Sequence, residues 1–515
     1  MATTFRQLNK ATASHLSGPQ HVTVRLSEPV PPHAFAAHWL APGAAKGLTL
    51  KRRKKLVRLV AASGVLPNME VALQAADFVG ALRAAFEEAA GAGHLPVCQW
   101  LRDLSVRTAD AHDALRADEA MQAAAGGGHQ HVCEWLLPIH PRALRGPDIR
   151  AAASKGHLDL AEWLIQQHPA CGGEGYLFGV AYGCDLPTLQ RAWPRFRRPH
   201  TGMYLRLWEE GLLCEAAGSP TPDWAAKVKW LEAQGCPLNS QAVWEAAYLP
   251  DDGEALARLT WLRGRGYSAS RDAVSAAACA GNTAALQYLL TEVAAPAVVA
   301  PSGQRDPVIS AARSGNLAAL QALLAAGWPM RASDVAPKAA RAGHLHVLAW
   351  LLDEHGAEPA GQLLNQALFS AAAASGSLEV LGWLRQRGCP WGCGAYSGAA
   401  EAGCEAALEW LVEQGCPMEE SGQPYMKASC NGDMATLRCL RRLGVPWGPT
   451  GQVFLGAATS RPDPVPLGQL RWLLQHGCPV EYEAAEERLS VSRGVRSQWA
   501  NEVLQLLAEH QRRPQ

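Results

Sequence analysis

The sequence predicts an all-α solenoid, built by stacking short helix-turn-helix units, and two observations support this prediction. The first is a sequence motif that recurs along the chain and is clearest in residues 339–352. Alanines end one helix, Gly343 stops it, and leucines recur at helical spacing on a second helix. The second is the distance between stop glycines, which is 28 residues from Gly315 to Gly343 and 33 residues from Gly343 to Gly376. About 28 residues hold two helices of roughly ten residues and a tight turn, so one unit is repeated many times.

The chain divides into three expected segments. Residues 1–50 lack the repeated motif and are expected to form a separate N-terminal segment. Residues 51–480 carry about 14 copies of the motif and are expected to form the solenoid. The copies run from a degenerate one at Gly64 to the last one at Trp472. Residues 481–515 are charged and amphipathic, as a terminal cap on an apolar stack must be, and are expected to form capping helices.

The composition indicates a soluble intracellular protein. Among 515 residues, 47 Lys and Arg are balanced by 47 Asp and Glu, so no global field attracts nucleic acid or an anionic membrane. The 14 cysteines accompany an N-terminus without a secretory pattern, and no stretch of 18 apolar residues appears. We therefore expect reduced thiols, no membrane partner and a cytoplasmic location, with the nucleus as the alternative.

Two basic clusters stand out in this neutral chain. Residues 51–55, Lys-Arg-Arg-Lys-Lys, open the first repeat helix and are interpreted as its solvated face, with a nuclear-import patch as the alternative. Residues 191–199 mix arginines with Trp193 and Phe196, a composition that also occurs in RNA-binding surfaces. We interpret this second cluster as a solvated insertion between repeats.

The repeated units resemble ankyrin repeats. The resemblance is carried by Gly343-His344-Leu345 followed by Leu348 and Leu351-Leu352, and it extends over about residues 61–480. It implies an α-solenoid whose concave surface binds a partner. The family's Thr-Pro-Leu-His opening is absent and the period is often about 28 instead of 33, so only a few short hairpins are expected. Residues 5–16 resemble a truncated F-box-like segment, which would dock a substrate receptor onto a ubiquitin-ligase scaffold.

Tryptophan is the most conspicuous residue type, with 18 copies. Nine of them precede a leucine at one fixed position of the second helix, and this phase beside core leucines indicates packing between repeats instead of a stacking surface. Trp328, Trp391 and Trp447 differ, because they follow the second helix at a turn. Loops carry binding residues more often than cores do, so these three are the candidate partner-binding residues.

The sequence contains no pattern that predicts a catalytic, cofactor-binding or metal site. His94, His129, His157 and His344 follow stop glycines at equivalent positions about one helix diameter apart, too far to share one ion, so we expect them to form hydrogen bonds at helix starts. Cys389 and Cys393 form one isolated close pair, and the glycines at 126–128 lack the lysine of a phosphate loop. We therefore expect no enzyme activity and no cofactor.

These observations predict a non-catalytic protein–protein interaction scaffold or adaptor. The alternative is a substrate-recognition subunit of a ubiquitin ligase, docked through residues 1–40. A third class is nucleic-acid binding through the two basic clusters. The expected partners are other proteins, with nucleic acid disfavoured, and the expected state is a monomer.

Overall fold

The computed structural model describes residues 25–108, 115–140, 144–169, 173–197, 203–296, 306–355, 363–459, 465–491 and 497–512. These residues are helical throughout, and their strand-like pairing is limited to an isolated antiparallel bridge between Phe78 and Asp433. The predicted all-α solenoid is confirmed. No hairpin is found in the described ranges, because units of about 28 residues are used up by two helices and their turn.

Fourteen helix pairs follow one another in the described residues, matching the fourteen predicted units. The first helices of the pairs are α5 (Leu50–Ser63), α7 (Ala81–Gly91), α9 (Ala117–Gly127), α11 (Gly146–Ser154), α13 (Glu174–Gly183), α15 (Met203–Ala217), α17 (Gln241–Ala247), α19 (Arg271–Ala280), α21 (Pro307–Ser314), α23 (Ala332–Ala342), α26 (Gln366–Ala373), α28 (Ala395–Ala402), α30 (Gln423–Cys430) and α32 (Gln452–Ala458). The second helices are α6 (Leu66–Ala76), α8 (Leu95–Thr108), α10 (Gln130–Ile139), α12 (Leu158–Gln167), α14 (Leu186–Phe196), α16 (Trp224–Ala233), α18 (Asp252–Gly264), α20 (Thr283–Glu292), α22 (Leu317–Ala325), α24 (Leu345–Ala349) with its π-helical continuation η2 (Trp350–His355), α27 (Leu378–Gln386), α29 (Glu405–Glu413), α31 (Met434–Arg442) and α33 (Leu467–Gln475).

Three further helices flank the pairs. Helix α4 (Pro32–Trp39) packs on α6, and its Phe35 joins the core. Helix α34 (Tyr482–Val491) and helix α35 (Ser497–Gln511) follow the last pair, and α35 contacts α33. The F-box-like residues 5–16 lie outside the described residues, so that prediction is not addressed by the structure.

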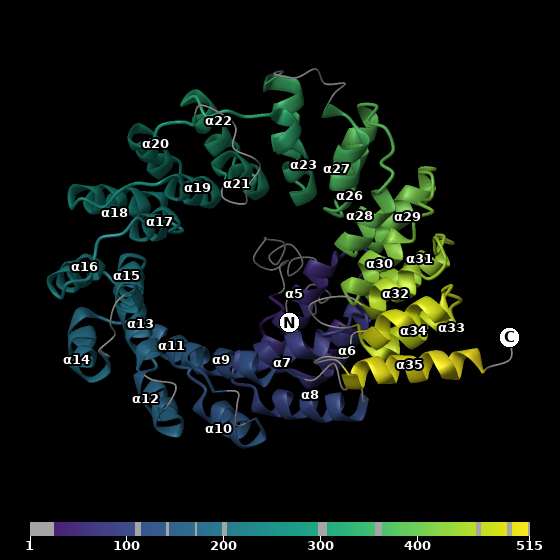
Figure 1. Ribbon diagram of the computed structural model, residues 1–515, viewed down its shortest axis with the longest axis horizontal. Helices are drawn as coiled ribbons and strands as arrows, with labels where there is room; N and C mark the ends of the chain where they lie inside the picture. The colour runs from purple at the N-terminus through teal and green to yellow at the C-terminus, as the bar shows by residue number, and fades with distance from the viewer. Residues whose placement is uncertain are drawn as a thin grey trace, which may run out of the picture.

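The helix pairs are arranged in a ring (Figure 1). Each first helix contacts the first helix of the next pair, from α5 to α32, and these helices surround a central opening. Second helices such as α12, α14 and α18 lie on the outside of the ring.

The curvature of the stack follows from the size of the side chains in its two rows of helices, the first helices on the inside and the second helices on the outside. First helices approach one another closely, and a Cβ placed on Gly179 or Gly183 would lie 2.7 and 2.0 Å from carbonyl oxygens of the preceding first helix. Second helices carry the repeated tryptophans, which fill the space between units; the rings of Trp224 and Trp261, for example, are 5.0 Å apart and nearly perpendicular. Narrow packing inside and wide packing outside make each unit a wedge, and wedges stack into a ring.

The ring closes where α5–α7 meet α28–α31, and the centre of this seam is a buried ion pair. The Arg53 guanidinium lies 2.5 Å from the carboxylate of Asp433, and it also donates to the carbonyl oxygens of Ala76 (2.6 Å) and Gly403 (2.9 Å). Asp433 is itself the N-cap of α31 and accepts from the backbone N–H of Thr436 at 3.1 Å. All charges and donors at this point therefore have partners.

Backbone hydrogen bonds extend the seam on both sides of the ion pair. They join the Val79 N–H to the Gly432 carbonyl (2.7 Å), the Ala435 N–H to the Asp77 carbonyl (3.1 Å) and the Ala406 N–H to the Lys46 carbonyl (3.0 Å). Exposed ion pairs, Lys46–Glu409 and Arg438–Asp77, surround them. The sequence predicts a solenoid of stacked units and contains no signal for closure, so the closed ring is the main feature that the sequence did not predict.

Polar side chains link each repeat to the one before it. The last carbonyls of a helix lack partners within that helix. Side chains from the following unit donate to them: Lys227 to Ala181 and Cys184 (2.7 and 2.8 Å), Arg258 to Ala217 and Ser219 (2.7 and 2.8 Å), Asn316 to Ala278 and Cys279 (both 2.9 Å). These contacts let polar residues lie in the interface between units without leaving acceptors unpaired.

The repeated histidines belong to the same set of contacts. His94 and His344 use Nε2 to hydrogen-bond the carbonyls of Ala62 (2.8 Å) and Arg313 (3.0 Å) at the end of the preceding first helix. The predicted helix-start hydrogen bond is wrong, because His129, His157 and His344 occupy N-cap positions without a side-chain capping bond. The imidazole instead forms a hydrogen bond with a carbonyl at the end of a helix in the neighbouring unit.

Candidate functional site

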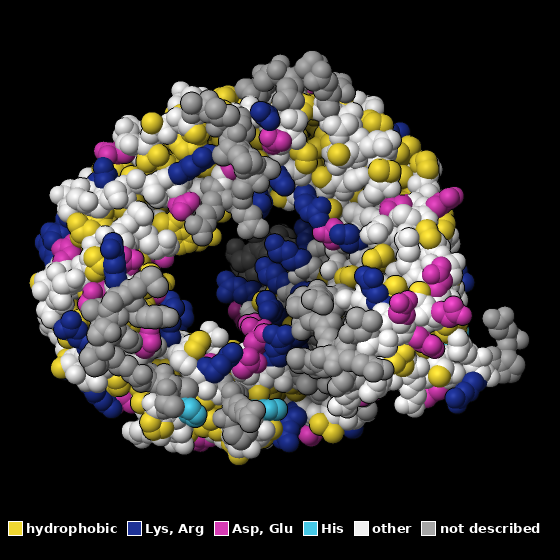
Figure 2. Space-filling model, in the orientation of Figure 1, with side chains coloured by type: hydrophobic (Ala, Val, Ile, Leu, Met, Phe, Trp, Pro, Cys, Tyr) yellow, Lys and Arg dark blue, Asp and Glu magenta, His cyan; other side chains and the backbone are white. Residues whose placement is uncertain are grey.

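The central opening of the ring is bordered by basic side chains over α5 (Figure 2). Helix α5 begins with residues 51–55, and Thr49 caps it by accepting from the Arg52 N–H at 3.3 Å. Lys51, Lys55 and Arg58 recur at helical spacing and are all exposed, so they share one face of the helix. The sequence predicts a solvated face here; the three side chains are exposed, and α5 lies at the central opening of the ring.

Most of the positive charge on this face is unbalanced. Arg58 pairs with Glu87 of α7 at 3.2 Å, and Arg53 is buried in the seam. Within the described part of the chain, no ion pair involves Lys51, Arg52 or Lys55. The basic run is helical, and its central residue, Arg53, is 1 % exposed.

Lys54 shows that the charges of α5 and α7 act together. Burial lowers the pKa of Lys54, and the guanidinium groups of Arg58 and Arg83 lower it further, against a smaller opposing effect of Asp433. Its ammonium lies over the Phe78 ring, 5.8 Å from the centroid. A cation whose pKa falls near other cations sits in a positive local potential, which is the potential that attracts an anion.

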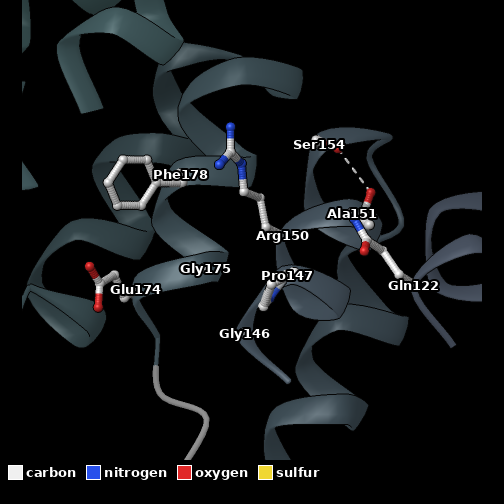
Figure 3. A pocket seen from close by; sticks show the side chains of 9 residues that line it. All are labelled: Gln122, Gly146, Pro147, Arg150, Ala151, Ser154, Glu174, Gly175 and Phe178. Atoms are coloured by element: carbon white, nitrogen blue, oxygen red, sulfur yellow. Dashed lines mark hydrogen bonds between the residues drawn. The ribbon is translucent and has the colours of Figure 1, made fainter. Parts of the chain in front are cut away.

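A second feature of the inner row is an open groove between α9, α11 and α13, with a volume of about 610 Å³ (Figure 3). Arg150 of α11 and Phe178 of α13 project side by side on it, and the guanidinium carbon is 5.7 Å from the ring centroid. Arg150 also pairs with Glu215 of α15. A Cβ on Gly175 would lie 2.3 Å from the Gly146 carbonyl, so glycine is required for α11 and α13 to meet at the floor of the groove.

The three tryptophans predicted to bind a partner pack within and between the units. Trp328 is 2 % exposed, with the Arg271 guanidinium 5.5 Å from its ring. Trp391 meets Phe369 edge to face at 5.4 Å, and Trp447 stacks on Tyr425 at 3.9 Å. Their role in ligand binding stays a prediction.

The second basic cluster is not part of the opening. Its described residues lie on α14 and at the C-cap of that helix, outside the inner row, and two of the arginines are paired: Arg195 with Glu162 (3.2 Å) and Arg197 with Glu209 (3.8 Å). The Arg197 guanidinium also lies over Trp193, 5.4 Å from its ring. These contacts hold α12, α14 and α15 together, which gives the cluster a structural explanation.

The described residues contain neither a metal site nor a membrane-spanning helix. No group of three or more His, Cys, Asp or Glu side chains is placed to hold a metal ion there. None of the described helices combines the length and the apolar character that crossing a bilayer requires.

Similarity to known proteins is found among solved structures. No family model matches the chain, and no curated protein matches it. Among solved structures, the chain is similar to the pentatricopeptide repeat protein PPR10 from maize, with 13 % identity, 89 % of this chain and 74 % of that chain covered, and a TM-score of 0.23. A second match is PPR10 in complex with an 18-nucleotide psaJ RNA element, with 12 % identity, 99 % and 89 % covered, and a TM-score of 0.25. The helical-repeat architecture of this chain is shown by its own stacked helix pairs.

The prediction about partners, which named other proteins and disfavoured nucleic acid, is contradicted. One of the matched helical-repeat structures is bound to RNA. The physical error lies in the use of net charge. A balance of 47 and 47 charges describes the whole chain, and it conceals the gathering of cations on one wall.

Proposed function

We propose that this protein is a non-catalytic binding ring whose ligand is a single-stranded nucleic acid held against the inner wall. The observation that carries the proposal is the alignment of Lys51, Lys55 and Arg58 on one exposed face of α5, inside a closed ring. Lysine and arginine side chains bind phosphates without reading sequence, and a concave wall of one sign concentrates the field on a polyanion.

A single strand suits the shape of this wall better than a duplex does. The inner row of helices curves continuously, and double-stranded nucleic acid is stiff over about 150 base pairs. A single strand bends at each nucleotide and follows a curved surface. The ankyrin-like character of the units enters this proposal as a prediction only.

The proposal is tested by titrating the full chain against fluorescent single-stranded RNA and DNA and following anisotropy at several salt concentrations. We expect binding that weakens steeply with salt, because each phosphate contact releases a counterion. Comparing RNA, DNA and duplex probes then identifies the preferred form. The proposal is wrong if none of these probes binds at low salt.

A pair of charge reversals on α5 locates the contact. Lys51→Glu with Lys55→Glu is expected to weaken binding at least about tenfold and to lower the salt slope. The matched control is Arg191→Glu with Lys229→Glu, which changes the net charge equally on the second helices α14 and α16. Equal effects of the two double variants would show that the charge of the whole molecule, and not the wall at α5, drives binding.

A further inference from the structure

Three neighbouring first helices on the far side of the opening from the seam carry large apolar side chains that reach the surface, two of them exposed (Leu207 and Tyr248) and two partly buried (Phe178 and Trp244). They are Phe178 on α13, Leu207 on α15, and Trp244 with Tyr248 at the end of α17. Leu207 is 57 % exposed and Tyr248 is 49 % exposed. Large apolar residues at such exposure on adjacent helices form a surface strip, which we call the aromatic arc.

The arc faces the interior of the ring. Helix α17 contacts α15 on one side, α19 on the other, and α18 behind it, and α18 lies outside it in Figure 1. Its buried positions, such as Val243 and Ala247, are turned toward these neighbours. The uncovered face with Trp244 and Tyr248 is therefore opposite α18, toward the opening. Helix α13 is placed in the same way between α11, α15 and α14.

The rings on the arc are already arranged for stacking. Trp244 and Tyr248 are parallel, with centroids 5.3 Å apart and planes 9° from each other. Being four residues apart, they are held on one face of the chain as α17 ends. Such a pair fixes the ring planes in advance and leaves part of Tyr248 open to water. Phe178 is held likewise, because a Cβ on Gly211 of α15 would lie 2.7 Å from its ring.

The charges around the arc favour bases over phosphates. Its cations are paired with carboxylates: Arg150 with Glu215, and Arg206 with Glu210 at 2.9 Å. Burial raises the pKa of Glu245, which lies between the two rings in sequence, and the carboxyl accepts a hydrogen bond from Gln241 at 3.5 Å. A wall whose charges are already compensated offers no site for a phosphate, but aromatic faces accept any base.

We infer that the aromatic arc is a nucleobase-stacking site, at which bases of a single strand stack on Tyr248 and Trp244 while phosphates of the same strand lie along α5. This inference rests on the proposed function. It assigns different contacts to two parts of the wall. The cations at α5 bind the phosphates of the strand, and the rings at α13–α17 bind its bases.

The test compares two ligands on the full chain. One is a single strand of about 30 nucleotides, and the other is an abasic strand with the same sugar–phosphate backbone. Tyr248→Ala is expected to weaken binding of the complete strand about fivefold or more, since one base stack is lost. Tyr248→Phe keeps the ring and should bind like the parent. Binding of the abasic strand should be weaker overall and unchanged by Tyr248→Ala.

The outcomes separate this inference from the proposed function. If the complete strand binds with a steep salt dependence but Tyr248→Ala and Trp244→Ala bind like the parent, the stacking site is wrong and the binding ring stands. The same holds if the abasic and complete strands bind equally. If no strand binds, both are wrong. Photocrosslinking of a 5-iodouridine strand, with the crosslinked peptide containing Trp244 or Tyr248, would support the site directly.

Discussion

Arg53 and Asp433 are 380 residues apart in sequence and form an ion pair of 2.5 Å in which the side chains are 2 % and 0 % exposed. This pair joins the first repeat to the thirteenth and turns a curved stack into a ring. In a solenoid each unit normally contacts only its neighbours, so this pair and the backbone bonds beside it couple repeats that are distant in sequence.

Asp433→Asn is expected to open the ring. The substitution keeps the shape of the side chain but leaves the buried guanidinium of Arg53 without its counter-charge, and breaking a buried pair costs about 3–5 kcal/mol. Small-angle scattering should report a larger radius of gyration, and hydrogen exchange should rise in α5, α28 and α31. Arg58→Ala is the control, because it removes an exposed pair on the same helix, worth about 0–1 kcal/mol. An unchanged scattering profile for Asp433→Asn would show that the backbone bonds alone hold the seam.

Gly315→Ala should destabilise the protein more than Gly327→Ala does. The two glycines have nearly equal positive φ values, 76° and 79°, so alanine suffers the same backbone strain at each, about 1–2 kcal/mol. Around Gly327 there is nothing within 4 Å, whereas a Cβ on Gly315 would lie 2.5 Å from Nδ1 of His344. The difference between the thermal unfolding midpoints of the two variants measures the steric part of the destabilisation, because the backbone strain is the same in both. Equal midpoints would mean that the imidazole moves aside without loss.

Asp148→Asn should remove part of the pH dependence of stability. Burial raises the pKa of Asp148 to about 7, although the Arg145 N–H donates to its carboxylate. Between about pH 4 and pH 7 the Asp148 carboxyl is therefore protonated in the folded state and ionised in the unfolded state. The stabilisation of the folded state by this proton is complete below pH 4 and is lost as the pH rises to 7. Urea midpoints at several pH values should fall less steeply in Asp148→Asn. The exposed Asp159→Asn serves as control, and parallel curves for all three proteins would contradict the assignment.

Lys227→Met should loosen the junction between α13 and α16. Its ammonium donates to the Ala181 and Cys184 carbonyls and to Ser219 Oγ at 2.7 to 2.8 Å, and the variant removes this donor from both buried carbonyls. The expected loss is about 3 kcal/mol, measured as faster hydrogen exchange in α13 and α16. Lys229→Met, an exposed position on the same helix, should have little effect. If both variants exchange alike, water replaces the ammonium.

The sequence predicts much of the local structure, because the signals there are local. Gly343 ends α23 with a φ of 81°, and Leu348 and Leu351 lie in the core, as the stop glycine and the leucine spacing indicate. The fixed phase of the tryptophans correctly predicts packing between units. Sequence reasoning misplaced the bonds of the histidines, since their acceptors lie about 30 residues back in a neighbouring unit.

The candidate binding residues were largely missed for the same reason. Tyr248 carries no motif, and its exposure depends on where α17 ends and on which neighbours leave its face uncovered. The basic run at residues 51–55 is visible in the sequence, but only the structure shows that α5 lies at the central opening and that Arg53 is buried in the seam. A signal was available in Trp244 and Tyr248, two large aromatic residues four apart on a short helix otherwise rich in alanine.

The repeated unit can be read from the amino-acid order alone: its two helices, its glycine stop and the leucine and tryptophan positions that stack it. These depend on periodicity and on backbone preferences that each segment carries alone. Closure of the stack becomes visible only in the folded chain, because closure depends on the sum of many small angles between units. A change of a few degrees per unit would separate Arg53 from Asp433, and no short stretch of sequence encodes that sum.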